Sequence, residues 1–279
     1  MTPAAPFYLD AAGGARYCLY HAPVGICRGA LLYVAPFGDE MNRTRHLAAR
    51  QARTLASAGI GVLQIDLYGC GDSAGEFSDA RWELWQDDLA LGHAWLLEKL
   101  GCPVGLWGLR LGALLALDYA FKAALPVERL LLWQPVVRGS AFLTQLLRLR
   151  LAGALLDGET AGRTGTSQLR EALLAGEPTE IGGYLVAPEL GAAIDRADAS
   201  SVPPVNIPVD WFDVLPAPGR PPGAAAVKQV TDWRIQGVTV RLHAVHGLPF
   251  WATQEITDCP SLVDATTALF QAPTHDCAS

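Results

Sequence analysis

The stretch from Pro103 to Leu115 constrains the fold of this chain more than any other segment. It reads PVGLWGLRLGALL: a short apolar run, a turn bounded by Gly108 and Gly112, and a segment rich in Ala and Leu. This pattern predicts a buried strand that turns tightly into a helix. Glycine on both sides of the turn indicates that the strand and helix backbones approach each other closely.

A strand, a tight glycine-bounded turn and a helix make up the nucleophile elbow of α/β-hydrolases, which presents a catalytic Ser at its apex. In this chain the apex residue is Arg110. A guanidinium group stays protonated and has no lone pair with which to attack a carbonyl carbon. The sequence therefore predicts the geometry of the elbow without its usual nucleophile.

Apolar runs of strand length alternate with helical segments along most of the chain. We expect strands at 29–37, 61–67, 127–137, 209–215 and 238–245, and helices at 43–58, 82–100, 222–233 and 261–270. Continuous apolar strands separated by helices are typical of a parallel sheet with crossover helices. The predicted class is α/β, specifically the α/β-hydrolase fold, with a mostly parallel central sheet flanked by helices.

The two ends of the sheet have their own signals. Residues 7–9 and 16–20 predict an antiparallel hairpin that turns at Gly13 and Gly14. Residues 238–245 alternate apolar and polar side chains, which predicts an edge strand with one solvated face.

The alternation of strands and helices stops at Arg138 and resumes after Ser201. Between them we expect no sheet strand, only helical stretches such as 143–155 and 168–174. We predict a core made of 1–137 and 202–279, with 138–201 inserted as a helical cap. The part from 138 to 170 holds five Arg, one Asp and one Glu. This excess of positive charge indicates either a solvated basic face or a surface that attracts an anionic ligand.

Composition limits the classes of function. A chain of 279 residues with 51% hydrophobic and 18% charged residues is typical of a globular domain with a substantial core. Its net charge of −7 argues against nucleic acid as a partner, because phosphate binding needs clustered basic residues.

The six cysteines show no Cys-x-x-Cys spacing, so we expect neither a zinc site nor a disulfide framework. We interpret them as scattered reduced thiols of a cytoplasmic protein. The first residues lack the basic and apolar regions of a signal peptide, and no apolar run is long enough to span a membrane. We expect no metal and no cofactor.

The elbow predicts further parts of a catalytic site. The loop after the strand 29–37 places Phe37 and Gly38 where one backbone N–H of an oxyanion hole is expected, and Leu111 would supply the second. Arg110 itself can bind a carboxylate, phosphate or sulfate. The alternative is an internal ion pair with Asp39 or Glu40, because a cation at a helix N-terminus needs compensation.

Of the other two members of a catalytic triad, the sequence offers a candidate histidine but no acid at the expected place. The window after strand 209–215 holds no carboxylate, and Asp210 and Asp213 should point to opposite faces of that strand. Gln134 ends the preceding strand, so the acid is missing there too. His246 stands where the catalytic histidine is expected, and Cys70, on a glycine-rich turn, is a candidate thiolate nucleophile.

Four motifs together resemble the exosortase A system-associated hydrolase 2 family: PFGDEMNRTR, LQIDLYGCGDSAGEF, LWGLRLGALLAL and PFWATQEITDCPSLVDAT. The resemblance covers residues 30 to 270. It implies an α/β-hydrolase fold, a bacterial exopolysaccharide or protein-sorting (PEP-CTERM) system as the setting, and Arg at the elbow as a family feature.

Two functions stay open at this point. In the first, the chain is a non-classical or inactive hydrolase that binds an anionic ligand or a partner, with Arg110 at the site. In the second, it is an active ester or thioester hydrolase, or an acyl transferase, on an acyl or glycosyl substrate. His246 or Glu40 would then activate water while Arg110 anchors the substrate. The sequence does not give the oligomeric state.

Overall fold

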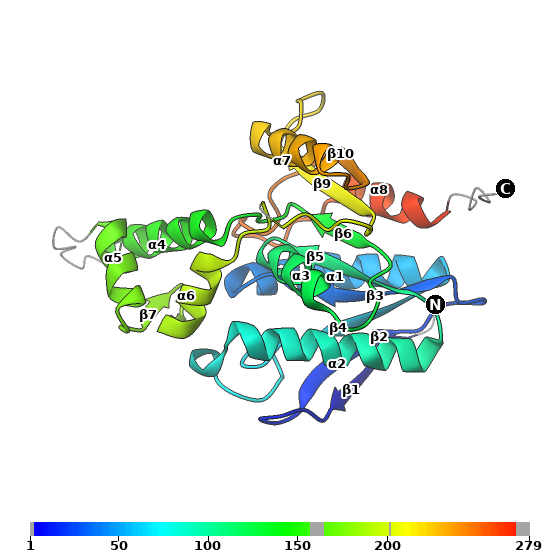
Figure 1. Cartoon of the computed structure of the whole chain (residues 1–279), viewed down its shortest axis with the longest axis horizontal. Coiled ribbons are helices and arrows are strands. Elements are labelled where there is room, and N and C mark those ends of the chain that lie inside the picture. The colour runs from blue at the N-terminus through cyan, green and yellow to red at the C-terminus, as the bar shows by residue number, and fades with distance from the viewer. Residues whose placement is uncertain (1–2, 157–164, 201, 272–279) are drawn as a thin grey trace.

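Figure 1 shows the computed structural model of the chain, which describes residues 3–156, 165–200 and 202–271. An eight-stranded sheet runs through it in the order β1-β2-β4-β3-β5-β6-β9-β10. Its strands are β1 (Ala5–Leu9), β2 (Arg16–His21), β3 (Gly29–Val34), β4 (Ile60–Ile65), β5 (Val104–Leu109), β6 (Leu130–Trp133), β9 (Val209–Leu215) and β10 (Val240–His246). β1 and β2 are antiparallel to their neighbours and the other pairs are parallel, so the predicted mostly parallel sheet is confirmed.

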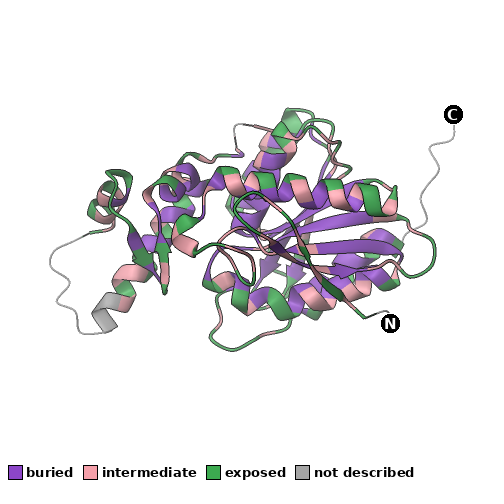
Figure 2. Cartoon of the chain, turned by 90° about the horizontal axis from the view of Figure 1, so that it is seen from below, coloured by how far each residue is buried: buried purple, intermediate pink, exposed green. Residues whose placement is uncertain are grey.

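Helices cover both faces of this sheet. The first face carries α2 (Trp82–Leu100), α3 (Leu111–Lys122) and α7 (Ala224–Ile235), and the second carries α1 (Asp39–Ser57) and α8 (Pro260–Gln271). β3 shows the reason: Leu32 and Val34 join the core under α2 and α3, while Leu31 and Tyr33 join the core under α1 and α8. The central strands β3, β4, β5, β6 and β9 are accordingly buried between the helical layers, as Figure 2 shows.

A mostly helical segment lies beyond the carboxyl ends of the strands, at the left of Figure 1. This 139–196 segment contains α4 (Gly139–Leu156), α5 (Thr166–Leu174), the short strands β7 (Thr179–Ile181) and β8 (Tyr184–Val186), and α6 (Pro188–Arg196). The antiparallel pair β7–β8 corrects the expectation of helices alone. Strands of three residues around a Gly-Gly turn are too short to give a readable alternation.

Some element boundaries differ from the sequence prediction. The strand expected at 127–137 is restricted to β6, because Gln134 adopts a φ of 41° and leaves the extended region. Helix α1 begins at Asp39, earlier than the expected 43, because Gly38 forms the turn that precedes it. The edge position of β10 is confirmed, although His246 is its last residue and not part of the following loop.

Candidate active site

The turn between β5 and α3 holds Arg110 in a strained backbone conformation. Its φ of 55° and ψ of −118° lie in a region that side-chain-bearing residues rarely adopt, at a cost of about 1–3 kcal/mol. Two backbone hydrogen bonds hold Arg110 in this conformation. Arg110 N donates to Trp133 O, at the end of β6, at 3.1 Å, and Val136 N donates to Arg110 O at 3.1 Å.

The glycines on both sides of the turn permit close backbone contact. A Cβ on Gly108 would lie 2.5 Å from Ala113 Cα, and one on Gly112 would lie 2.3 Å from the carbonyl oxygens of Val34 and Ala35. No side chain fits at these distances. The close approach of strand and helix predicted from the two glycines is therefore confirmed.

The side chain of Arg110 is paired inside the protein. Its Nε lies 3.2 Å from Glu40 Oε1 and 3.4 Å from Oε2. The two side chains are only 11% and 17% exposed. The guanidinium carbon also lies 5.9 Å from the ring centre of Phe142 and 5.4 Å from that of Trp251. Of the two alternatives for Arg110, the structure shows the internal ion pair.

Burial dominates the electrostatics of this pair. It raises the pKa of Glu40, and the positive charge and hydrogen bond of Arg110 offset only part of that rise. The ion pair thus compensates the cation at the start of α3 without making the carboxylate strongly acidic.

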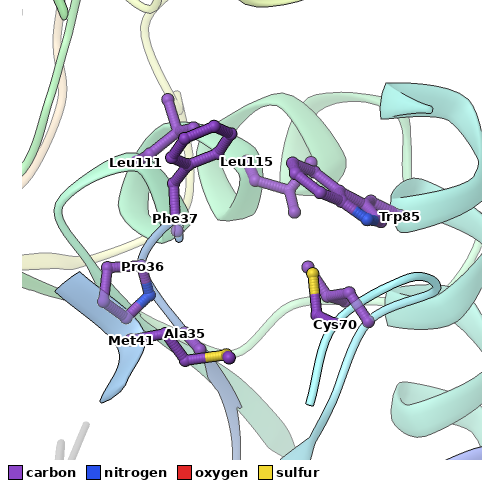
Figure 3. Close-up of a pocket in the computed structure, with 10 residues that line it drawn as sticks. Ala35, Pro36, Phe37, Met41, Cys70, Trp85, Leu111 and Leu115 are labelled. Carbon is purple, nitrogen blue, oxygen red and sulfur yellow. The ribbon is translucent and has the colours of Figure 1, made fainter. Parts of the chain in front are cut away.

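Two of the candidate oxyanion residues, Phe37 and Leu111, lie at a very small apolar cavity (Figure 3). Phe37, Leu111 and Cys70 line it, and its volume of about 20 Å³ is that of a single water. The backbone N–H groups of Gly38 and Leu111 donate no hydrogen bond to a residue that the structure describes. Burial raises the pKa of the Cys70 thiol to about 12, which disfavours a thiolate nucleophile at neutral pH.

His246 lies at the exposed end of β10. Its backbone oxygen accepts hydrogen bonds from Ser261 Oγ and, at 3.8 Å, from Cys259 Sγ. Its imidazole forms no hydrogen bond or ion pair with any residue among the described ranges. The loop after β10 brings Trp251 to Arg110 instead, and this contact had no signal in the sequence.

The carboxylates of β9 take opposite faces, as predicted. Asp210 Oδ1 lies 2.8 Å from His243 Nε2 and 2.8 Å from Arg241 Nε. Burial alone would raise the pKa of Asp210, but these two hydrogen-bonded partners outweigh it and lower the pKa. This imidazole–carboxylate pair joins Asp210, near the start of β9, to His243, in the middle of the edge strand β10.

Comparisons with known proteins support the fold. No protein-family model matches the chain, and no curated protein matches it. Among solved structures, Est1E from Butyrivibrio proteoclasticus with bound ferulic acid is 16% identical with a TM-score of 0.65, covering 95% of this chain and 96% of its own. A thermostable carboxyl esterase from Bacillus coagulans in complex with glycerol is 15% identical with a TM-score of 0.66, covering 96% and 98%.

A monoglyceride lipase variant from Saccharomyces cerevisiae is 12% identical with a TM-score of 0.65, covering 97% and 96%. The chain has the α/β-hydrolase fold. At these identities the likeness establishes the fold alone.

One further cavity had no signal in the sequence. In this α/β-hydrolase fold it opens between α4 and α7, at the carboxyl ends of β6 and β9, with a volume of about 530 Å³. We call it the α4–α7 cavity. Its walls comprise Gln134, Pro135, Val136, Val137, Arg138, Ala141, Phe142, Gln145, Trp211, Asp213, Gly223, Ala225, Ala226, Lys228 and Gln229.

The polar groups of the α4–α7 cavity are partly fixed. Asp213 Oδ2 accepts a hydrogen bond from Gly223 N at 2.6 Å, and Gln134 Oε1 accepts one from Val214 N at 2.7 Å. Phe142 is shared, because it lines this cavity and also faces the guanidinium of Arg110. The cavity therefore adjoins the elbow without including Arg110 in its walls.

The described ranges offer neither a membrane-spanning helix nor a metal site. No helix there combines the length and the apolar character that crossing a membrane requires. No group of three or more His, Cys, Asp or Glu side chains in those ranges is arranged to hold a metal ion.

Proposed function

We propose that this protein is a ligand-binding member of the α/β-hydrolase fold in which Arg110 stands at the position of the catalytic Ser. The observation that carries this proposal is the state of Arg110: it sits at the apex of an intact elbow, ion-paired to Glu40 and flanked by Phe142 and Trp251. A guanidinium there cannot form an acyl-enzyme. In this proposal Arg110 closes the apex and does not anchor the ligand.

The ligand site is the α4–α7 cavity, and the ligand is an anion with an apolar body. Phe142 and Trp211 offer aromatic walls for the body, while Arg138 and Lys228 offer positive charge. These two side chains are 63% and 73% exposed, and their partners Asp198 and Asp232 are exposed as well. Exposed ion pairs contribute little, so a ligand anion can compete for both cations.

The cap and the biological role are proposed from the sequence pattern and from the resemblance of the four motifs to the exosortase A system-associated hydrolase 2 family. We propose that 138–201 acts as a cap on a core of 1–137 and 202–279, since Phe142 of α4 closes both the elbow and the cavity. We also propose a cytoplasmic location and a role in an exopolysaccharide or protein-sorting system. Deleting the gene from its host and measuring exopolysaccharide yield tests that role, and an unchanged yield contradicts it.

Two probes of equal shape test the ligand site. We expect 4-nitrobenzoate to raise the melting temperature of the wild-type protein more than neutral 4-nitrobenzamide does. Ala141→Trp and Ala225→Trp, which fill the cavity from α4 and α7, should abolish the difference. Lys228→Ala should reduce it, whereas Lys122→Ala, which removes a lysine in the same type of i,i+4 pair with Asp118, should not. Equal shifts from both probes contradict the proposal.

A reagent that labels catalytic serines tests the second part of the proposal, that the elbow has no serine nucleophile. A fluorophosphonate probe should leave the wild-type protein unlabelled, because Arg110 offers no attacking oxygen. Labelling of the wild-type protein at any serine contradicts the proposal.

One observation favours the alternative of an active hydrolase. The N–H groups of Gly38 and Leu111 have no described hydrogen-bond acceptor, as an oxyanion hole requires. Water activated by Glu40 or His246 would then attack an ester or thioester. Turnover of 4-nitrophenyl acetate by the wild-type protein, lost in both Glu40→Gln and Arg110→Ala, would support this alternative. Turnover equal to buffer excludes it for that substrate.

A further inference from the structure

Two of the cysteines lie next to each other although they are 75 residues apart in the chain. Cys27 precedes β3, Cys102 precedes β5, and their Sγ atoms are 2.7 Å apart. This is well inside the distance at which two sulfur atoms normally stay apart without a bond. Both thiols are free, in agreement with the prediction of reduced thiols, but the sequence did not indicate that these two would lie side by side.

The parallel sheet explains why these two residues meet. β3 and β5 are neighbours in the sheet, with Ala30 opposite Val104, and Ala30 N donates to Pro103 O at 3.0 Å. Parallel neighbours begin at the same edge of a sheet, so the residues just before them are adjacent. The register holds both thiols at this edge, opposite the end of β5 that carries Arg110.

We propose that Cys27 and Cys102 form a dithiol site that closes to a disulfide when the protein meets a peroxide. The thiolate of Cys27 attacks one oxygen of hydrogen peroxide, the O–O bond breaks, and a sulfenic acid forms as hydroxide leaves. The hydroxide takes up the proton that Cys27 had released and becomes the first water. The sulfur of Cys102 then attacks the sulfur of Cys27. The S–O bond breaks, the proton of Cys102 leaves with the hydroxide as a second water, and the peroxide has been reduced by two electrons.

Access to the site and the raised pKa of Cys102 assign the two sulfurs their roles. Both residues are half-buried, and the adjoining Ile26 is 86% exposed, so a small oxidant can reach the site. Burial, and then the hydrogen bond with Cys27, raise the pKa of Cys102 to about 12. Cys102 thus keeps its proton until Cys27 has been oxidised, and it acts as the resolving thiol.

The other described cysteines provide internal controls. Cys18, Cys70 and Cys259 have no second cysteine sulfur within hydrogen-bonding distance in the described ranges. Burial raises the pKa of Cys18 and of Cys70 to about 12. These thiols should react slowly with peroxide and should form no crosslink.

The test is oxidation of the full chain by hydrogen peroxide, followed by intact mass measurement and peptide mapping without reductant. The wild type and Cys70→Ala should lose two hydrogen atoms and yield one crosslinked peptide pair that contains Cys27 and Cys102. Cys27→Ser and Cys102→Ser should yield no such pair, and Cys102→Ser should stop at a sulfenic acid on Cys27. A crosslink already present before oxidation also supports the proposal.

A second measurement separates the crosslink from damage by the oxidant. Closing a loop of this length constrains the unfolded chain and should raise the melting temperature by about 5–10 °C. Dithiothreitol should reverse the rise, and neither Ser variant should show it. The proposal is overturned if both thiols remain open to alkylation after oxidation, if the wild type gains only oxygen, or if the crosslink joins other cysteines.

Discussion

The elbow and the α4–α7 cavity lie side by side and share Phe142, yet they differ in how their space is used. At the elbow, Arg110 is buried against Glu40 and Trp251, and the cavity lined by Phe37, Leu111 and Cys70 has a volume of only about 20 Å³. The neighbouring cavity offers about 530 Å³. Arg110 is paired inside the protein, while the larger space lies one side chain away. The backbone geometry of the β5–α3 turn therefore does not by itself mark where this protein has room for a ligand.

The two regions also differ in the source of their rigidity. At the elbow, glycines without a Cβ let the β5–α3 turn pack against the loop after β3, and Arg110 tolerates a strained backbone. At the cavity, the side chains of Gln134 and Asp213 accept hydrogen bonds from the backbone N–H groups of Val214 and Gly223 and so connect neighbouring segments. We expect substitutions in the elbow to change the stability of the fold and substitutions in the cavity to change ligand binding.

The largest expected effect comes from adding one methyl group in each region. Gly112→Ala should reduce the free energy of unfolding by roughly 4 kcal/mol, because its Cβ would overlap two backbone oxygens that cannot move aside. Gly223→Ala is the matched change at the cavity, where the new Cβ would lie 3.5 Å from Asp213 Oδ2, and should change stability by less than about 1 kcal/mol. Urea unfolding of both variants checks this, and equal losses would remove the distinction between the regions.

Removing the charge of Arg110 should have the next largest effect. Arg110→Leu leaves Glu40 buried without its partner and should cost about 2–3 kcal/mol of stability. The double variant Arg110→Leu/Glu40→Leu should recover most of that loss, because no uncompensated charge remains. A double-mutant cycle measures the coupling. Additive losses would mean that the ion pair does not stabilise the closed elbow.

Substitution of Phe142 tests the comparison directly, because this side chain contacts Arg110 and also lines the α4–α7 cavity. Phe142→Leu should cost about 1 kcal/mol through lost contact with Arg110 and with Phe37, whose ring centre is 6.1 Å away. It should also weaken the response to 4-nitrobenzoate. Gln145→Leu, on the same helix and lining only the cavity, should weaken that response without the loss of stability. A variant pair with the opposite pattern would contradict the shared role of Phe142.

The smallest effects should appear in the pH dependence of stability, with opposite signs for Glu40 and Asp210. The pKa of Glu40 is raised by burial, so its contribution is complete below pH 4.5 and is lost as the pH rises through the folded value. The pKa of Asp210 is lowered by its partners despite burial, so its contribution is present above pH 3.8 and is lost as the pH falls through the folded value.

Melting curves between pH 3 and pH 7 test these signs. Glu40→Gln should remove a decline of stability toward neutral pH, and Asp210→Asn should remove part of the acid destabilisation. If Glu40→Gln instead removes acid destabilisation, Arg110 lowers the pKa of Glu40 and the sign assigned here is wrong.

The sequence alone determined the architecture of this protein. Continuous apolar strands alternating with helices predicted the parallel sheet, and Gly108 and Gly112 predicted the close turn, because periodicity and the absence of a Cβ are local properties. The sequence also placed an Arg, and no Ser, in the turn between β5 and α3. These inferences needed no knowledge of which distant residues meet.

Only the tertiary structure decided what surrounds the turn. The choice of Glu40 over Asp39 as the partner of Arg110, the arrival of Trp251, and the α4–α7 cavity all depend on how α1, α4 and the loop after β10 pack around the sheet. The meeting of Cys27 and Cys102 depends in the same way on the order of strands in the sheet. Contacts between residues far apart in the chain are set by side-chain packing and strand register, which leave no periodic trace in the sequence.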